Sequence, residues 1–192
     1  MSEAYRLERR ERILLAAARC FARDGFHATS MDDVIAEAGL SAGAVYGYYS
    51  GKEELVRAAA GRAIELVTTA LPEVVRAPTP AAMLERLLTF AYEAEDRLGF
   101  DAPRVAVQAW GEAARNPVVR EAVADGYRTI RGHLADAVRQ WQADGTIDAG
   151  ADPQELAKVL FGLVPGFIVQ RQLLGDVQPD RYAGALAALL PG

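Results

Sequence analysis

The sequence contains few of the residues that build metal and redox sites. It has one cysteine, Cys20, in 192 residues, so an intrachain disulfide cannot form. Its two histidines, His27 and His133, together with that cysteine, do not supply the ligand set of a zinc site. We therefore expect no metal and no cofactor. Because Cys20 lies in an apolar helical pattern, we expect a buried thiol without a redox role.

Signals of catalysis and of membrane insertion are also scarce. We expect neither a glycine-rich phosphate loop nor a nucleophile elbow of the Gly-x-Ser-x-Gly type. The carboxylates follow the spacing of ordinary helix surfaces, so we expect no catalytic residues and no enzyme activity. No apolar segment is expected to reach the roughly 18 residues of a membrane span, and an apolar signal-peptide region is missing. These absences predict a soluble cytoplasmic protein with no membrane partner.

Charge is distributed unevenly. The net charge of −5 argues against DNA binding through bulk electrostatics. Arginine is nevertheless concentrated near the start of the chain, at positions 6, 9, 10, 12, 19 and 23. Glutamates are interleaved with these arginines, so one interpretation of the segment is a solvated helix with ion pairs along its surface. The other is an arm that reaches DNA phosphates, for which Arg6 and Arg10 are the candidates.

A short helix is indicated soon after this arginine-rich region. Thr29 or Ser30 can cap its first turn, with Asp32 and Asp33 at the acidic positions of a capping box. Gly39 can end it, because glycine adopts positive φ without steric cost. The pattern predicts a helix of about two turns.

A second helix must begin almost at once. Ser41 can cap a helix over Ala42–Tyr49, and two helices this close cross at a steep angle, which predicts a helix-turn-helix. Ser50 and Glu53 have the spacing of a capping box for a third helix. The start of that helix and the side chain of Lys52 could bind a phosphate.

The outer side of the second helix suits close approach to DNA. It carries small residues and tyrosines without an acid, and in such motifs this helix enters the major groove. We expect phosphate contacts from the tyrosines, Thr29 and Lys52, and base proximity from the small residues. The full set of expected DNA contacts is Arg6, Arg10, Thr29, Ser30, Ser41, Ala42, Gly43, Ala44, Tyr46, Gly47, Tyr48 and Lys52.

The motif residues recur at fixed spacing without a gap: Thr29, Val34-Ile35-Ala36, Ala38-Gly39-Leu40-Ser41, Gly43, Val45-Tyr46, Tyr48-Tyr49 and Lys52-Glu53-Glu54-Leu55. This run resembles the N-terminal domain of the TetR family of bacterial transcriptional repressors. The resemblance implies a homodimer of helical subunits, each with a small DNA-binding domain and a larger domain for dimerisation and inducer binding. Two departures, Ala42 and Gly47 in place of larger polar residues, predict sparse direct base readout.

The rest of the chain also has a helical pattern. Proline and capping residues mark helix starts at Pro80, Pro103, Pro117 and Pro153, and we expect helices to about residues 98, 115, 144 and 173. A long helix from Lys52 to about residue 75 and a last short helix, which Pro179 starts and which covers 183–190, complete the pattern. We predict an all-α fold with a DNA-binding domain, residues 1–51, and a ligand-binding and dimerisation domain, residues 52–192.

The segment 153–173 is apolar nearly all round, so both of its faces must be buried. A twofold dimer interface with the last helix would cover one face, whereas in the alternative both helices are core. The expected interface residues are Leu156, Leu160, Leu163, Phe167, Gln170, Leu174, Leu186 and Leu189.

Large apolar residues mixed with a few polar ones occur along the middle helices, as they do around ligand pockets. Ordinary core packing is the alternative for each of them. The expected ligand-binding residues are Met83, Phe90, Arg104, Gln108, Trp110, Tyr127, Phe161 and Phe167.

The sequence therefore predicts a ligand-responsive repressor. A homodimer would bind a pseudo-palindromic double-stranded DNA operator, and a small apolar or aromatic inducer of unknown identity would release it. The alternative is a helical ligand-binding or partner-docking module that does not bind DNA, and an enzyme is a third class.

Overall fold

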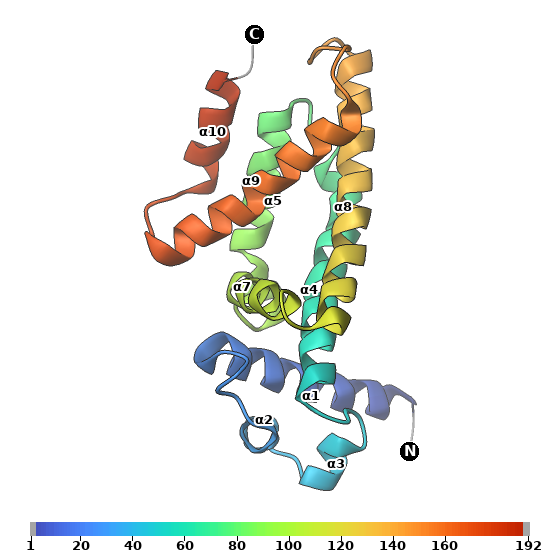
Figure 1. Ribbon diagram of the computed structural model, residues 1–192, viewed down its shortest axis with the longest axis vertical. Helices are drawn as coiled ribbons and strands as arrows, with labels where there is room; N and C mark the ends of the chain where they lie inside the picture. Colours follow the sequence, from blue (N-terminus) through green and yellow to red (C-terminus); the bar gives the residue numbers. More distant parts are fainter. Residues whose placement is uncertain (1–2, 190–192) are drawn as a thin grey trace. The chain divides into compact units, whose positions relative to one another are not determined.

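The computed structural model describes residues 3–189, apart from the side chains of residues 95 and 96, and this part of the chain is helical without strands (Figure 1). The all-α prediction is confirmed. The helices are α1 (Glu3–Asp24), α2 (Met31–Ala38), α3 (Ala42–Tyr46), α4 (Lys52–Val74), α5 (Pro80–Tyr92), α6 (Ala94–Leu98), α7 (Ala102–Ala113), α8 (Pro117–Ala143), α9 (Pro153–Leu173) and α10 (Pro179–Leu189).

The chain forms two compact units. Unit 1 comprises Met1–Ile64 and Ala94–Ala124, and unit 2 comprises Glu65–Glu93 and Asp125–Gly192. Helices α4 and α8 each contribute to both units. The functional division at residue 51 stays a prediction, since a unit defined by packing need not coincide with a unit defined by function.

Unit 1 is built on α1, which packs against both α2 and α7. Ile13, Ala17 and Cys20 of α1 are fully buried, as are Val34 of α2 and Val45 of α3. The predicted burial of the Cys20 thiol is confirmed, and burial raises the pKa of this thiol. The absence of a redox role for Cys20 stays a prediction, which this burial favours because a protonated thiol is a weak nucleophile.

Two apolar clusters lie among the described residues of unit 2. The first includes Leu71, Met83, Leu134 and Trp141, and the indole nitrogen of Trp141 donates to the carbonyl of Ala77 at 2.8 Å. The second cluster contains Leu84, Leu88, Phe167 and Ala183, which join α5, α9 and α10. These buried side chains lie at the helical spacing of apolar residues that is visible in the sequence.

Two helix boundaries differ from those expected. Helix α3 ends at Tyr46 because Gly47, a poor helix former, serves as its C-cap. Helix α5 ends at Tyr92 instead of continuing to Leu98, because Glu93 adopts φ −86° and ψ 0° as a C-cap before the separate helix α6. Helix α10 begins at Pro179 as expected, because proline suits a first helical position.

The face of α9 expected to form a dimer interface packs inside unit 2. Leu156 and Leu160 lie against the first cluster and Leu163 against the second, while Phe167 is only 1% exposed. Leu186 of α10 also packs on the second cluster. Phe167 is therefore a core residue and is withdrawn from the expected interface. Leu156, Leu160, Leu163 and Leu186 are only partly buried, so their place in a dimer interface stays a prediction.

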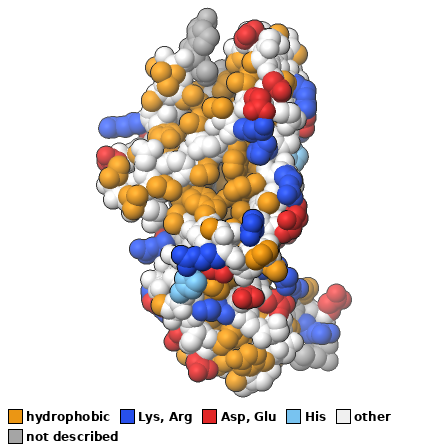
Figure 2. Space-filling model, viewed as in Figure 1, with side chains coloured by type: hydrophobic (Ala, Val, Ile, Leu, Met, Phe, Trp, Pro, Cys, Tyr) orange, Lys and Arg blue, Asp and Glu red, His pale blue; other side chains and the backbone are white. Residues whose placement is uncertain are grey.

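Another side of α9 is more exposed. Val159, Gly162, Gly166, Val169 and Leu173 recur at alternating intervals of three and four residues, which places them along one line of the helix. The valines and the leucine are 64%, 38% and 77% exposed. We call these five residues the α9 stripe. Figure 2 shows hydrophobic side chains at the surface of unit 2 around α9.

Helix α9 is also long and apolar enough, by length and composition, to cross a membrane, with a mean hydropathy of 1.2. We expected no such segment, so this prediction requires correction. Only 17% of its apolar window is buried within the chain. A helix that packs on a second protein surface has the same composition as a membrane span, because both bury apolar side chains on more than one face.

Candidate DNA-binding surface

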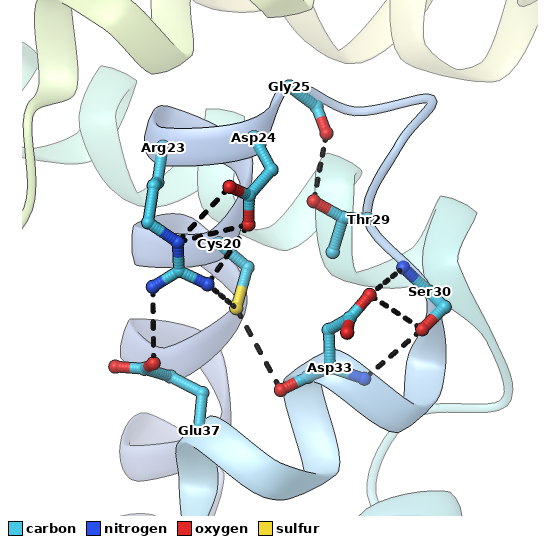
Figure 3. Close-up of polar contacts among 8 residues, drawn as sticks. All are labelled: Cys20, Arg23, Asp24, Gly25, Thr29, Ser30, Asp33 and Glu37. Carbon is cyan, nitrogen blue, oxygen red and sulfur yellow. Dashed lines mark hydrogen bonds and ion pairs between the residues drawn. The ribbon is translucent and has the colours of Figure 1, made fainter.

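Helix α2 has defined start and stop positions. Ser30 is its N-cap: its hydroxyl accepts from the Asp33 amide at 3.1 Å, and its own amide donates to the Asp33 carboxylate at 2.8 Å (Figure 3). The capping box therefore uses Ser30 and Asp33 among the alternatives that the sequence offered. Gly39 ends the helix in the left-handed region, with φ 61°.

Thr29 lies inside unit 1. It is 1% exposed, and its hydroxyl donates to the carbonyl of Gly25 at 2.8 Å (Figure 3). This bond closes the turn that follows α1, where Gly25 has φ 83°. We leave Thr29 out of the proposed DNA contacts, because its hydroxyl already serves the fold.

An arginine that we had not singled out for the motif joins α1 to α2. The guanidinium of Arg23 donates to both carboxylate oxygens of Asp24, at 3.1 and 3.0 Å, and to Glu37 of α2 at 3.4 Å (Figure 3). The side chain of Arg23 is 56% exposed, so these ion pairs stabilise the junction only modestly. The sequence shows Arg23 near Asp24 and Glu37, but whether the arginine reaches Glu37 depends on the angle between α1 and α2.

Helix α3 is short and its outward residues are small. The hydroxyl of Ser41 accepts from the Ala44 amide at 3.3 Å and caps it, as predicted. Val45 is fully buried and anchors α3 to unit 1. Ala42 and Gly43 are exposed, and Tyr46 is 51% exposed. The outward side of α3 thus carries one large side chain.

Residues 39–43 read Gly-Leu-Ser-Ala-Gly and match the letters of the Gly-x-Ser-x-Gly motif, which we had not expected to occur. A nucleophile elbow joins a strand to a helix and exposes a strained serine. Ser41 instead lies between α2 and α3 and caps a helix. The segment is therefore the turn of a helix-turn-helix, and its resemblance to a hydrolase motif is coincidental.

Lys52 binds the loop between α1 and α2. Its ammonium donates to the carbonyl oxygens of Phe26, His27 and Thr29 at 2.9, 3.3 and 2.9 Å. It also lies 4.6 Å from the centroid of the Phe26 ring. Lys52, which we predicted to bind a phosphate, therefore stabilises the loop between α1 and α2, because its three N–H donors already have acceptors.

The neighbouring side chains of the α3–α4 junction also differ from expectation. The hydroxyl and amide of Ser50 donate to Glu54, at 2.9 and 2.8 Å, and not to Glu53. Tyr48 is partly buried, and its hydroxyl has no hydrogen-bond partner among the described residues. The Tyr48 hydroxyl would have to move to meet a phosphate, whereas the Tyr46 side chain is already exposed.

The two arginines chosen in the first helix are both exposed. Arg6 and Arg10 are four residues apart in α1 and so share one face of the helix. The guanidinium carbon of Arg10 lies 5.8 Å from the centroid of the Tyr49 ring, at the end of the helix-turn-helix. A positive charge is therefore present beside the motif.

The expected ligand residues divide between the two units. Arg104, which is exposed, and the partly buried Gln108 and Trp110 lie in α7 of unit 1. In unit 2 the rings of Tyr127 and Phe161 meet edge to face, 4.6 Å apart.

The other expected ligand residues also belong to unit 2. Met83 and Phe167 are core residues with 0% and 1% exposure, and Phe90 is partly buried. Met83 and Phe167 are therefore core residues, which was the alternative to ligand binding for each of them.

The α2 capping box makes part of the stability dependent on pH. Hydrogen bonds from the Ser30 hydroxyl and amide lower the pKa of Asp33 below its ordinary value of 3.8. The stability that they give is present above this value and is lost as the pH falls through the lowered pKa. Ser30→Ala should therefore lower the melting temperature near neutral pH, and this difference from the wild type should shrink at about pH 3.

Thermal melts at the two pH values check this expectation. Ser41→Ala is the matched control, because Ser41 caps α3 through a backbone amide without a carboxylate partner. Its effect should not change with pH. An effect of Ser30→Ala that is equally large at both pH values would contradict the assigned role of Asp33.

Comparison with known proteins identifies both parts of the chain. The family described as "Bacterial regulatory proteins, tetR family" matches residues 13–59, which include α2 and α3. The family described as "Tetracyclin repressor-like, C-terminal domain" matches residues 105–187. Together the two matches span well over half of the chain.

Individual relatives are similar along nearly their whole length. The HTH-type transcriptional regulator UidR of Escherichia coli strain K12 is 25% identical over 184 residues, 95% of this chain and 91% of UidR. The structure of GusR from Salmonella enterica aligns with a TM-score of 0.74 at 26% identity and covers 99% of this chain and 98% of GusR. A putative transcriptional regulator from Saccharomonospora viridis, solved with choline, aligns with a TM-score of 0.79 at 26% identity and covers 95% of both chains.

These relatives are regulators and not enzymes, and they lend no support to the alternative of a docking module without DNA binding. Regulators of this family bind DNA operators and dimerise, and some respond to ligands. The matched region contains the capped helix-turn-helix described above. The chain belongs to the TetR family of bacterial transcriptional regulators.

Proposed function

We propose that this protein is a cytoplasmic, non-enzymatic repressor that binds a pseudo-palindromic operator as a homodimer and leaves it when an inducer binds. The observation that carries the proposal is the exposed, acid-free α3, held on α1 by a capped α2 within the matched family domain. Residues 1–51 would read DNA, and residues 52–192 would dimerise and bind the ligand.

The proposed DNA contacts follow from exposure. Arg6, Arg10, Ser41 and Tyr46 have exposed polar or charged side chains that can donate to phosphates. Ala42, Gly43, Ala44 and Gly47 would lie nearest the bases, since they form the rest of α3 and its cap. Lys52 and Ser30 would act chiefly by holding the motif in shape.

The proposed dimer uses the α9 stripe. An exposed apolar line with an open glycine, Gly162, suits a second helix, because glycine permits close contact between helix backbones. In a twofold dimer the same line from both subunits would meet. The exposed Leu174 and Leu189, 67% and 81% accessible, could extend this surface from the residues first expected there.

The proposed inducer is a small apolar or aromatic molecule. The support within unit 2 is the partly buried aromatic pair of Tyr127 and Phe161. Within unit 1, Gln108 and Trp110 are also partly buried and are separate candidates. The related Saccharomonospora viridis protein was solved with choline, so chains of this fold can hold small molecules. Such a ligand would act by binding more tightly to the state that does not fit the operator.

A footprint on the DNA just upstream of the coding region tests the function. Purified protein should protect a twofold-symmetric site in the presence of nonspecific competitor, and its affinity should fall as salt rises. If no sequence is preferred, either there or after selection from random DNA, the proposal is wrong. Apolar and aromatic small molecules can then be screened for release of the footprint.

A further inference from the structure

The outward side of α3 is bare backbone. Val45, fully buried, points into unit 1. Successive residues of an α-helix are rotated by about 100°, so residues two positions before and after a buried one project to the opposite side. These are Gly43 in α3 and Gly47, the C-cap of α3, and both are exposed. The line of α3 farthest from the core thus has no side chains.

The flanks of this line carry methyl groups and one tyrosine. Ala42 is exposed, Ala44 is partly exposed, and Tyr46 is 51% exposed. Figure 2 shows hydrophobic side chains gathered at the end of unit 1 where Figure 1 places α3. Arginine, lysine, asparagine and glutamine make the two-bond contacts that identify guanine and adenine, and none of these occurs in Ala42–Tyr46.

We propose that α3 reads its operator mainly through thymine methyl groups, and that Gly43 and Gly47 permit the close approach this requires. The C5-methyl of thymine is the apolar group that base pairs present in the major groove, and alanine is a natural partner for it. Ala42 and Ala44 supply methyl groups, while Tyr46 is the large polar side chain available for a hydrogen bond. The inference rests on the proposed operator binding and adds the kind of half-site that α3 fits.

Gly43→Ala tests the close approach. An ideal Cβ on Gly43 meets no protein atom within 4 Å, and its φ is not in the positive region, so only DNA would encounter the added methyl. Because alanine favours helix more than glycine does, the variant should melt at the same or a higher temperature. Its operator affinity should fall by about tenfold, the usual consequence of overfilling a packed contact.

Gly61→Ala is the matched control. Gly61 is another exposed helical glycine, in α4, with no protein atom near an added Cβ. This variant should gain the same helix preference and keep its operator affinity. Equal affinity of the Gly43→Ala variant and the wild type would overturn the close approach of α3.

Deoxyuridine in place of thymine tests the methyl readout. The substitution removes the C5-methyl and keeps every base-pairing group, so affinity should fall about fourfold at each thymine that α3 covers. Ala42→Gly and Ala44→Gly each remove one alanine methyl. In the variant that lacks the methyl contacting a given thymine, deoxyuridine at that position should no longer lower the affinity. This comparison is made within one variant on two DNAs, and a general effect of glycine on α3 therefore cancels.

The outcomes separate the inference from the proposed function. A wild-type protein without sequence preference would overturn both. A specific footprint that is insensitive to deoxyuridine at every half-site thymine would leave operator binding intact and overturn the methyl readout. Deoxyuridine sensitivity that is lost in an alanine-to-glycine variant would assign the contact to that alanine.

Discussion

Glutamate at both Val159 and Leu173 should convert the protein to monomers and lower operator affinity by at least about 100-fold. These residues lie on the α9 stripe and are 64% and 77% exposed in the single chain. In a twofold interface each substitution occurs twice, so four carboxylates would be buried without partners. A cost of about 3 kcal/mol or more is expected from burying unpaired charge, which corresponds to a hundredfold change in the association constant.

Sedimentation and operator titration of the double variant measure this effect. Val118→Glu is the control, because Val118 is 54% exposed at the start of α8 and lies outside the stripe. It should dimerise and bind DNA like the wild type. A double variant that is folded and still dimeric would exclude the α9 stripe as the interface.

Lys52→Ala should lower the free energy of unfolding by about 2 kcal/mol, the scale expected for hydrogen bonds from a charged donor. The ammonium is bonded to the carbonyls of Phe26, His27 and Thr29, which immediately precede α2. Without it, three carbonyls lose their donor and the loop between α1 and α2 loosens. Operator affinity should fall with stability, because the position of the helix-turn-helix relative to α1 depends on that loop.

Urea denaturation and a salt titration of operator binding distinguish the two possible roles of Lys52. Loss of a phosphate contact reduces the slope of log affinity against log salt by about one, whereas loss of a structural contact leaves it unchanged. We expect an unchanged slope and reduced stability. Reduced slope with full stability would restore the phosphate role. Lys158→Ala, which removes an exposed ion pair with Glu155, should alter neither quantity.

Short-range patterns predicted the helix-turn-helix because its signals are local. Ser30 and Gly39 define α2 through bonds within a few residues, and Ser41 starts α3 in the same way. The end of α3 was less predictable, since Gly47 stops the helix only weakly and the following tyrosines continue an apolar pattern. Capping partners one residue apart, such as Glu53 and Glu54, are chosen by side-chain geometry that sequence spacing does not resolve.

The sequence by itself determined the all-α fold, the position of the reading motif and the membership of a regulator family, because these depend on local periodicity, capping and motif spacing. Only the tertiary structure decided which polar groups are free. Thr29 is buried, and Lys52 donates to backbone carbonyls that lie 23 to 26 residues earlier in the chain. The tertiary structure also decided which side of α9 is core: a helix apolar all round has no preferred inner face until its neighbours pack against it, and packing left the stripe from Val159 to Leu173 exposed.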